Sequence, residues 1–170
     1  MGYTELHCLS NFSFLRGASH PEELVAQAHA LGYQGLALTD ECSLAGVVKA
    51  WQAAKALPDF RLIIGTELRF DDGALVVVLA PDREGYAELS TLITAARRRA
   101  AKGSYQVDWG ELQQLRQALV LWRPPAVDGA VLERGLALAR ALPGRLWLLA
   151  GRSLSAGERQ QQQQWQQLAD

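Results

Sequence analysis

The sequence lacks most of the features that mark secreted, membrane and nucleotide-binding proteins. It contains only two cysteines, Cys8 and Cys42, too few for a disulfide framework and with a spacing that matches no zinc motif. No basic region followed by a long apolar run opens the chain, and no apolar run is long enough to span a membrane. Walker-type phosphate loops, GxGxxG and nucleophile elbows are missing too. Nucleotide hydrolysis, dinucleotide chemistry and α/β-hydrolase activity are therefore excluded as leading functions.

An excess of charge of either sign is also missing. The net charge of the 170 residues is −1, so no overall field attracts nucleic acid or an anionic membrane, and a DNA contact would need a local patch. With 49% apolar and 21% charged residues, the composition is that of a globular domain large enough to bury a core. We find no repeat, linker or domain boundary. We expect one domain over residues 1–170, located in the reducing cytoplasm, with no membrane partner.

Strand and helix patterns alternate along the chain. Apolar runs predict strands over residues 3–8, 35–39, 61–68, 74–80, 118–122 and 145–150. Helical spacing of apolar residues, with caps and breakers at the ends, predicts helices over 21–31, 44–57, 127–142 and 156–169, a helix that begins near Asp82 and a short helix after Asp108. This alternation predicts an α/β fold with a parallel sheet and crossover helices, and leaves open whether the sheet is doubly wound or a barrel.

Local signals mark some of the element ends. Ser19 and Glu22 have the spacing of a capping box for the helix over 21–31. Residues 71–73, Asp-Asp-Gly, predict a turn between two strands. The last predicted helix has a thin apolar stripe of Trp165 and Leu168, which predicts a surface helix or a helix whose packing partner is missing from this chain.

Polar residues accompany the ends of the first three predicted strands. They are Glu5 and His7, then Asp40 and Glu41, then Glu67. Because parallel strands end at one edge of a sheet, we expect these side chains to gather there. Carboxylates with an imidazole can bind Mn²⁺ or Zn²⁺ and activate water. The alternative, which the residues alone favour, is a half-buried structural histidine with carboxylates that cap helices, Asp40 being a natural cap.

One dense basic run offers a second candidate site. Its residues are Arg97, Arg98, Arg99 and Lys102. Tyr105 and Trp109 follow it, and basic residues interleaved with aromatic ones can contact a nucleic-acid backbone. The alternative is a solvated helix C-terminus, where cations suit the helix dipole. We expect at most a weak auxiliary contact with nucleic acid.

Several ordered segments resemble one known family. They read LHCLSNFSFLRGASHPEELV at 6–25, GLALTDECSLAGV at 35–47, LIIGTEL at 62–68 and LVVVLAPDREGYAELSTLI at 75–93. Together they resemble the N-terminal PHP (polymerase and histidinol phosphatase) domain of bacterial C-family DNA polymerases, of the error-prone, damage-inducible α-subunit type. The resemblance covers nearly the whole chain and weakens after residue 117, and several motifs at consistent spacing make it specific.

The resemblance implies a distorted, TIM-like (β/α)₇ barrel with metal ligands at the carboxyl ends of its strands. Because a TIM-like barrel takes about 250 residues, we expect these 170 residues to form an incomplete barrel, without its last strands and without the polymerase core. An unclosed barrel leaves a sheet edge and apolar faces uncovered, so we expect marginal stability.

The resemblance also implies a remnant metal site. His7 matches the first histidine of the family's His-x-His motif, and Glu67 matches the glutamate of a later motif. The family's Thr-Asp-His becomes Thr39-Asp40-Glu41, so Glu41 stands at a ligand histidine and Asp40 is a supporting residue. These residues would hold Mn²⁺ or Zn²⁺ if the remnant site is live.

Other ligand positions of the family have been lost. Leu9 replaces the second histidine of the first motif, Arg16 stands in the loop where related domains often have an acidic residue, and Leu75 lies near a further histidine. Leucine cannot bind a metal ion, and arginine is permanently charged. We therefore expect Arg16 to pair with Glu41 or Glu67 and to replace the cation, with no cofactor bound to this segment.

The function implied is that of the front segment of an error-prone DNA polymerase, a DNA-directed nucleotidyltransferase of damage-induced translesion synthesis in replication and repair. The whole protein would bind DNA, use Mg²⁺ in the absent polymerase core and meet accessory translesion proteins and a sliding clamp. This segment would be an inactive scaffold. Two alternatives remain open: an active metal-dependent phosphoesterase or 3′–5′ exonuclease, and a non-catalytic docking module that uses the glutamine-rich last helix and the arginine run.

Overall fold

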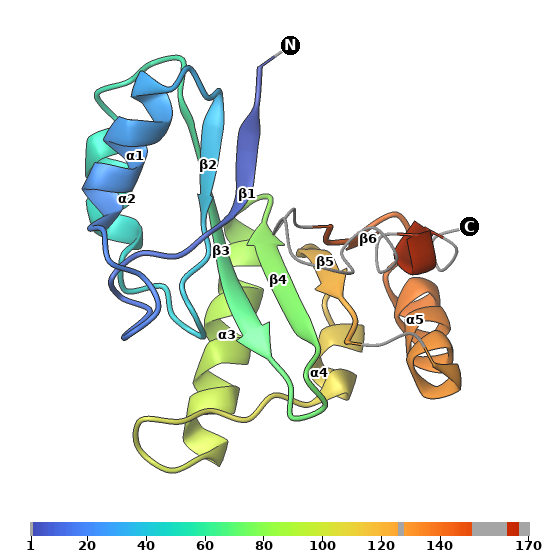
Figure 1. Cartoon of the computed structure of the whole chain (residues 1–170). Coiled ribbons are helices and arrows are strands. Elements are labelled where there is room, and N and C mark those ends of the chain that lie inside the picture. The colour runs from blue at the N-terminus through green and yellow to red at the C-terminus, as the bar shows by residue number, and fades with distance from the viewer. Residues whose placement is uncertain (1, 126–127, 151–162, 167–170) are drawn as a thin grey trace.

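The computed structural model describes residues 2–125, 128–150 and 163–166 (Figure 1). In chain order its elements are β1 (Thr4–Cys8), α1 (Pro21–Ala30), β2 (Gly35–Leu38), α2 (Val47–Ala54), β3 (Arg61–Arg69), β4 (Leu75–Ala80), α3 (Arg83–Arg99), α4 (Trp109–Gln113), β5 (Leu119–Arg123), α5 (Gly129–Ala141) and β6 (Leu146–Leu148). Each corresponds to an element predicted from the sequence, with ends that differ by a few residues.

The strands form one mixed sheet, and the prediction of a wholly parallel sheet is wrong. The strand order is β1-β2-β3-β4-β5-β6. The pairs β1–β2, β2–β3 and β5–β6 are parallel, whereas β4 runs antiparallel to both β3 and β5. Residues 70–74 join β3 to β4 through a turn in which Gly73 has a φ of 85°. Because a parallel return needs a dozen or more residues, so short a connection enforces a hairpin.

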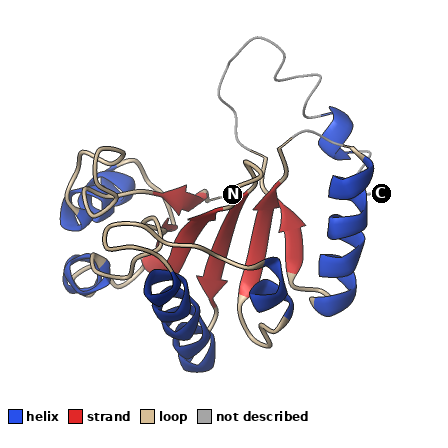
Figure 2. Ribbon diagram, turned by 90° about the horizontal axis from the view of Figure 1, so that it is seen from below, coloured by secondary structure: helices blue, strands red, loops and turns tan. Residues whose placement is uncertain are grey.

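The sheet curls, and its helices lie around the outer side of the curve (Figure 2). Helices α1 and α2 cover β2, and α3, α4 and α5 continue the layer past β4 and β5. The opposite, concave face carries an apolar groove of about 900 Å³, lined among others by Ile63, Leu79, Leu121 and Trp147. The fold is an α/β half barrel, and the prediction of an incomplete barrel is confirmed.

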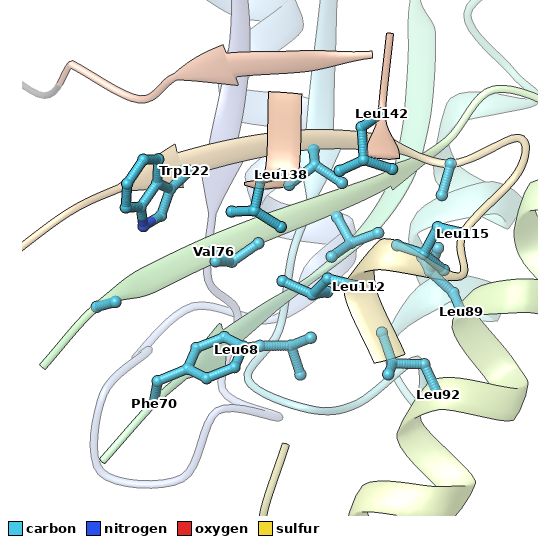
Figure 3. Packing of buried hydrophobic residues seen from close by; sticks show 14 of the residues in the cluster. Leu68, Phe70, Val76, Leu89, Leu92, Leu112, Leu115, Trp122, Leu138 and Leu142 are labelled. Carbon is cyan, nitrogen blue, oxygen red and sulfur yellow. The ribbon is translucent and has the colours of Figure 1, made fainter. Parts of the chain in front are cut away.

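Strand β4 shows how the sequence pattern divides the two faces. Its apolar run places Val76 and Val78 against the helices and Leu75 and Val77 on the concave face. A slip of one residue in its pairing would exchange the two sets of side chains, and because both sets are apolar, only the fit of their shapes to the two faces distinguishes the observed register. Figure 3 shows the helix side, where Leu68, Val76, Leu89, Leu112 and Leu138 are among the residues that pack together.

The predicted start of α1 is correct, but its predicted cap is wrong by one residue. The capping residue is His20 rather than Ser19, and the reciprocal carboxylate is Glu23 rather than Glu22. The backbone N–H of His20 donates to Glu23 over 2.8 Å. The capping box keeps its spacing of three residues, from His20 to Glu23. Pro21 takes the first helical position, where a backbone N–H would have no partner within the helix.

The predicted last helix lies mostly outside the described residues. Of residues 156–169 the structure describes 163–166, which are helical and include the buried Trp165. Within the described part of the chain, no helix has the length and apolar character needed to cross a bilayer.

Candidate functional site

Polar side chains meet where β1, β2 and β3 end. Glu67 lies near the end of β3, opposite Val77 of β4, and its side chain points to the concave face. Glu41 follows β2 and pairs with Glu67 in an isolated parallel bridge. His7 of β1 alternates with Cys8, which packs toward the helices, so the imidazole also faces the concave side. The parallel part of the sheet therefore brings three predicted site residues together.

Glu67 is the centre of this group. Its side chain is 0% exposed, and His7 Nε2 lies 2.6 Å from its Oε2. Arg69 Nε donates to Glu67 Oε1 over 2.8 Å, and Arg16 Nη1 donates to the same oxygen. Burial alone would raise the pKa of Glu67, but hydrogen bonds from His7, Arg16 and Arg69 outweigh it and lower the pKa to about 2. The carboxylate is therefore ionised throughout the physiological range.

Arg16 lies between the two carboxylates. Its Nη1 donates to Glu41 Oε2 over 2.6 Å as well as to Glu67, and its Nη2 lies 3.4 Å from Glu67 Oε2. Burial alone would lower the pKa of Arg16, but the bonds to Glu67 and Glu41 raise it above its ordinary value. One guanidinium therefore neutralises charge on residues 25 and 51 positions away in the chain.

Glu41 has a further partner in the loop after α3. The hydroxyl of Tyr105 donates to Glu41 Oε1 over 2.7 Å and accepts from the backbone N–H of Arg69 over 3.0 Å. The guanidinium of Arg97 lies 5.3 Å from the Tyr105 ring centroid and donates to the carbonyl of Cys42. Burial and the hydrogen bond to Glu41 raise the pKa of the Tyr105 hydroxyl. Tyr105 was missed as a site residue, because only the tertiary fold brings it to Glu41.

Asp40 holds the loop that carries Arg16. Its side chain, 1% exposed, accepts from the backbone N–H of Ser10 over 2.8 Å and from the hydroxyls of Ser10 and Ser13 over 2.7 Å each. The prediction that Asp40 caps a helix is wrong, because α2 begins only after Gly46. Asp40 instead fastens residues 9–19, and the two serines had not been recognised from the sequence.

The same loop is closely folded. A Cβ on Gly17 would lie 1.9 Å from the carbonyl oxygen of Ser10, so only glycine fits there. Leu15 has a φ of 60°, which is rare outside glycine. Phe14 and Leu15 point to solvent, with 84% and 89% of their surface exposed. The fold of residues 9–19 thus turns Arg16 inward while its two apolar neighbours face outward.

With this arrangement established, comparison with known proteins places the chain in a family. The sequence profile of the PHP domain matches residues 5–155. The chain belongs to the PHP domain family. The prediction of a PHP domain from the motifs is confirmed, and the matched residues include His7, Glu41 and Glu67.

The relatives of this PHP domain are much longer than the chain itself. A protein from Methylococcus capsulatus named error-prone DNA polymerase is 53% identical over 158 residues, which are 92% of this chain and 15% of the relative. A protein of the same name from Hahella chejuensis is 51% identical over 163 residues, or 91% of this chain and 15% of the relative. An amidohydrolase structure from Chromobacterium violaceum, with bound sulfate and no metal, is 26% identical and covers 57% of this chain and 34% of its own. Its TM-score of 0.48 is too low to add to the assignment.

The residues of this PHP domain do not fit a divalent metal ion as they stand. Of the ligand positions that the resemblance implies, His7, Glu41 and Glu67 have side chains that could ligate, whereas Leu9 cannot. The positive guanidinium of Arg16 already contacts the oxygens of both glutamates. Among the residues that the structure describes, no three His, Cys, Asp or Glu side chains are arranged as a metal site. A second cation between Glu41 and Glu67 would meet like charge.

Glu5 and the two cysteines, Cys8 and Cys42, have no hydrogen bond or ion pair with the carboxylates of this group. Glu5 accepts from the Tyr3 hydroxyl over 2.8 Å and from the backbone N–H of His7 over 2.9 Å, so its carboxylate turns back along β1. Cys42 is buried and Cys8 is half-buried, and both are free thiols. Burial raises the pKa of each thiol to about 11. The expectation that Glu5 joins the other carboxylates is therefore wrong. Both cysteines behave as small apolar residues, as their sequence context predicted.

The basic run of this PHP domain is partly occupied by internal contacts. Arg97 donates to backbone carbonyls near Cys42, and Arg99 pairs with Glu111, with Nη2 2.6 Å from its carboxylate. Trp109 stacks on Phe70 with ring centroids 3.8 Å apart. Arg98 and Lys102 are exposed. A nucleic-acid contact was predicted for four residues, Arg97, Arg98, Arg99 and Lys102. Two of them, Arg97 and Arg99, already make contacts within the protein.

Proposed function

We propose that this chain is the N-terminal PHP segment of an error-prone DNA polymerase, and that the segment acts as a scaffold rather than as a hydrolase. The relatives named error-prone DNA polymerase support the first part. The second part is carried by one observation, the contact of Arg16 with both Glu41 and Glu67. We extend the proposed PHP segment to the whole of residues 1–170, beyond the matched residues 5–155.

The scaffold role follows from what an arginine can and cannot do at this place. A bound metal ion lowers the pKa of its water and so supplies hydroxide for hydrolysis. A guanidinium has no open coordination position and cannot do this. It does neutralise Glu41 and the buried Glu67, and it ties residues 9–19 to the ends of β2 and β3. The charged cluster of His7, Arg16, Glu41, Glu67 and Arg69 therefore keeps the shape of a PHP site without its chemistry.

The remaining activity belongs to the longer protein. We propose that the parts beyond this segment extend a DNA primer with Mg²⁺, in damage-induced translesion synthesis in the cytoplasm. DNA, accessory translesion proteins and a sliding clamp would be the partners of that protein. Arg98 and Lys102 offer this segment a weak auxiliary contact with the DNA backbone.

A chimera tests the scaffold role. The matching segment of the Methylococcus capsulatus relative, 15% of its length, would be replaced by this chain, and primer extension compared with the unaltered relative and with a deletion of the same segment. We expect the chimera to extend primers and the deletion to lose activity. A folded chimera without primer extension would contradict the proposal, because a scaffold that is 53% identical should support the same core.

An active metal-dependent phosphoesterase or 3′–5′ exonuclease is the second candidate. The observation in its favour is the pairing of His7 with Glu67 at the carboxyl end of the strands. Its test is hydrolysis of p-nitrophenyl phosphate and of a mismatched 3′ end, with and without Mn²⁺, together with the metal content of chelator-free protein. We expect no hydrolysis above buffer. Hydrolysis that needs Mn²⁺ and disappears in His7→Ala would replace the scaffold proposal with this one.

A further inference from the structure

The loop of residues 9–19 presents two large apolar side chains to solvent, beyond the end of β1 (Figure 1). Phe14 is 84% exposed and Leu15 is 89% exposed, and we call this pair the loop tip. The other exposed large apolar side chains in the described part of the chain reach at most 63%, the value for Val48. Single exposed apolar residues are common, but adjacent ones on a fixed support indicate a surface for a partner.

The loop tip is fastened on both sides. Before it, Ser10 and Ser13 donate to the buried carboxylate of Asp40. After it, Arg16 contacts the two glutamates of the charged cluster. A side chain on a fixed backbone loses less conformational freedom when a partner covers it, so more of its burial energy remains for binding. The loop therefore presents its tip already arranged for a contact.

The backbone of the loop tip is strained at Leu15. Its φ of 60° lies in the left-handed region, which glycine or asparagine adopts at a lower cost than leucine does. The leucine side chain does not repay this cost by burial inside the domain, because 89% of its surface is in solvent. A strained residue that packs little within its own domain points to a contact outside it.

We propose that the loop tip docks into an apolar pocket of the polymerase core that follows this segment in the longer protein. The proposal rests on the scaffold role above and names the surface through which the scaffold holds the core. The relative from Methylococcus capsulatus matches this chain over 15% of its own length, so most of such a protein lies outside the segment and is available as the partner.

The size of the loop tip favours a partner in the same polypeptide. A specific complex of two separate proteins buries about 1,200–2,000 Å² in total, whereas one aromatic side chain supplies about 150–250 Å². Two side chains are therefore too few to hold a free protein. A domain joined to the segment by the chain has an effective concentration in the millimolar range, so a contact of this size is enough to fix its position.

Photo-crosslinking in the chimera described above tests the contact directly. Phe14→p-benzoylphenylalanine places a photoreactive group at the loop tip, and Val48→p-benzoylphenylalanine places the same group on α2 as a control. After irradiation, mass spectrometry identifies the joined peptides. We expect position 14 to crosslink to a peptide of the core within the same molecule, and position 48 to give no such product.

Primer extension by the chimera tests whether the contact is needed. Phe14→Ser combined with Leu15→Asn removes the apolar surface and keeps a residue that tolerates a positive φ. Leu31→Ser combined with Val48→Ser is the control, because these side chains are 59% and 63% exposed and lie outside the loop. We expect extension to fall by about tenfold or more in the first variant and to stay within about twofold in the control.

Two results would overturn the docking surface. One is a crosslink from position 14 that stays within the segment or joins two copies into a product of twice the mass, and the other is full primer extension by the folded loop-tip variant. If that variant does not fold, Phe14→Ser alone replaces it, with the same loss expected. A folded chimera that extends no primer contradicts the scaffold role, and its crosslink from position 14 still decides the docking surface.

Discussion

Both halves of this sheet pack an apolar layer against helices, but they differ in their polar contacts. At the ends of β1, β2 and β3, the charged cluster joins side chains from distant parts of the chain around the buried Glu67. Behind β4, apolar side chains such as Val76, Leu89 and Leu138 pack into a continuous layer (Figure 3). The first half, called the charged half below, therefore adds individual charged groups to its apolar layer, whereas the second, called the apolar half, is represented by volume and burial. Changes of charge at the cluster should affect mainly the charged half.

The largest expected effect is in the apolar half. Leu89 of α3 is 0% exposed, and Leu89→Ala should lower the free energy of unfolding by about 3 kcal/mol, because it removes buried surface and leaves a cavity. Urea unfolding measures this. Leu136→Ala, on the half-exposed face of α5, is the control and should change stability by no more than about 0.5 kcal/mol. Equal losses in the two variants would mean that the layer is not close-packed.

A smaller effect is expected from the charged half. Arg16→Ala leaves Glu67 with His7 and Arg69 but removes the bridge to Glu41, and should cost about 2 kcal/mol in urea unfolding. Arg69→Ala should cost less than about 1 kcal/mol, since 48% of its side chain is exposed and Arg16 still contacts Glu67. The contrast between the halves disappears if Arg16→Ala costs as much as Leu89→Ala.

The smallest effect, taken per pH unit, is a dependence of stability on acidic pH to which Glu67 of the charged half should contribute most, since the pKa values of Glu88 on α3 and Glu111 on α4 are also lowered. The pKa of Glu67 falls from 4.5 to about 2 on folding, so the unfolded chain binds more protons than the folded protein between these values. The stability that Glu67 contributes is complete above pH 4.5 and is lost as the pH falls toward 2. The slope is at most about 1.4 kcal/mol per pH unit.

Urea unfolding at a series of acidic pH values measures that slope. Glu67→Gln cannot ionise and should reduce the slope without abolishing it, because Glu88 and Glu111 remain. The control is Glu84→Gln, which replaces an exposed side chain of α3 that lies outside the charged cluster. Equal slopes in wild type and Glu67→Gln would show that another carboxyl controls acid unfolding.

The sequence predicted the elements well because their patterns are local. The apolar run of β4 and the caps at Asp82 and Asp108 can be recognised within a few residues, and both capping side chains accept backbone hydrogen bonds in the structure. The direction of β4 was wrong because an apolar run looks the same in parallel and antiparallel sheets. The five residues between β3 and β4 contained the missing information.

The site was predictable where a residue either matches or replaces a position of the expected family pattern, as His7, Glu67 and Arg16 do. Arg16 attracted attention because it replaces an acidic residue of related domains, and it contacts both glutamates it was expected to meet. Tyr105 lies 64 residues from Glu41, and Ser13 lies 27 from Asp40, so no local spacing indicates either contact. Asp40 was assigned to a helix that begins later than its pattern suggested.

The hairpin of β3 and β4 also bears on the order in which the chain folds. Its strands are joined by residues 70–74, whereas β1, β2 and β3 meet only after whole helices have been crossed. Closing a short loop loses less chain entropy than closing a long one, so pairings between near neighbours form faster. We expect β3 to take its register from β4 before it meets β2, so that the apolar strand aligns Glu67 before Arg16 arrives.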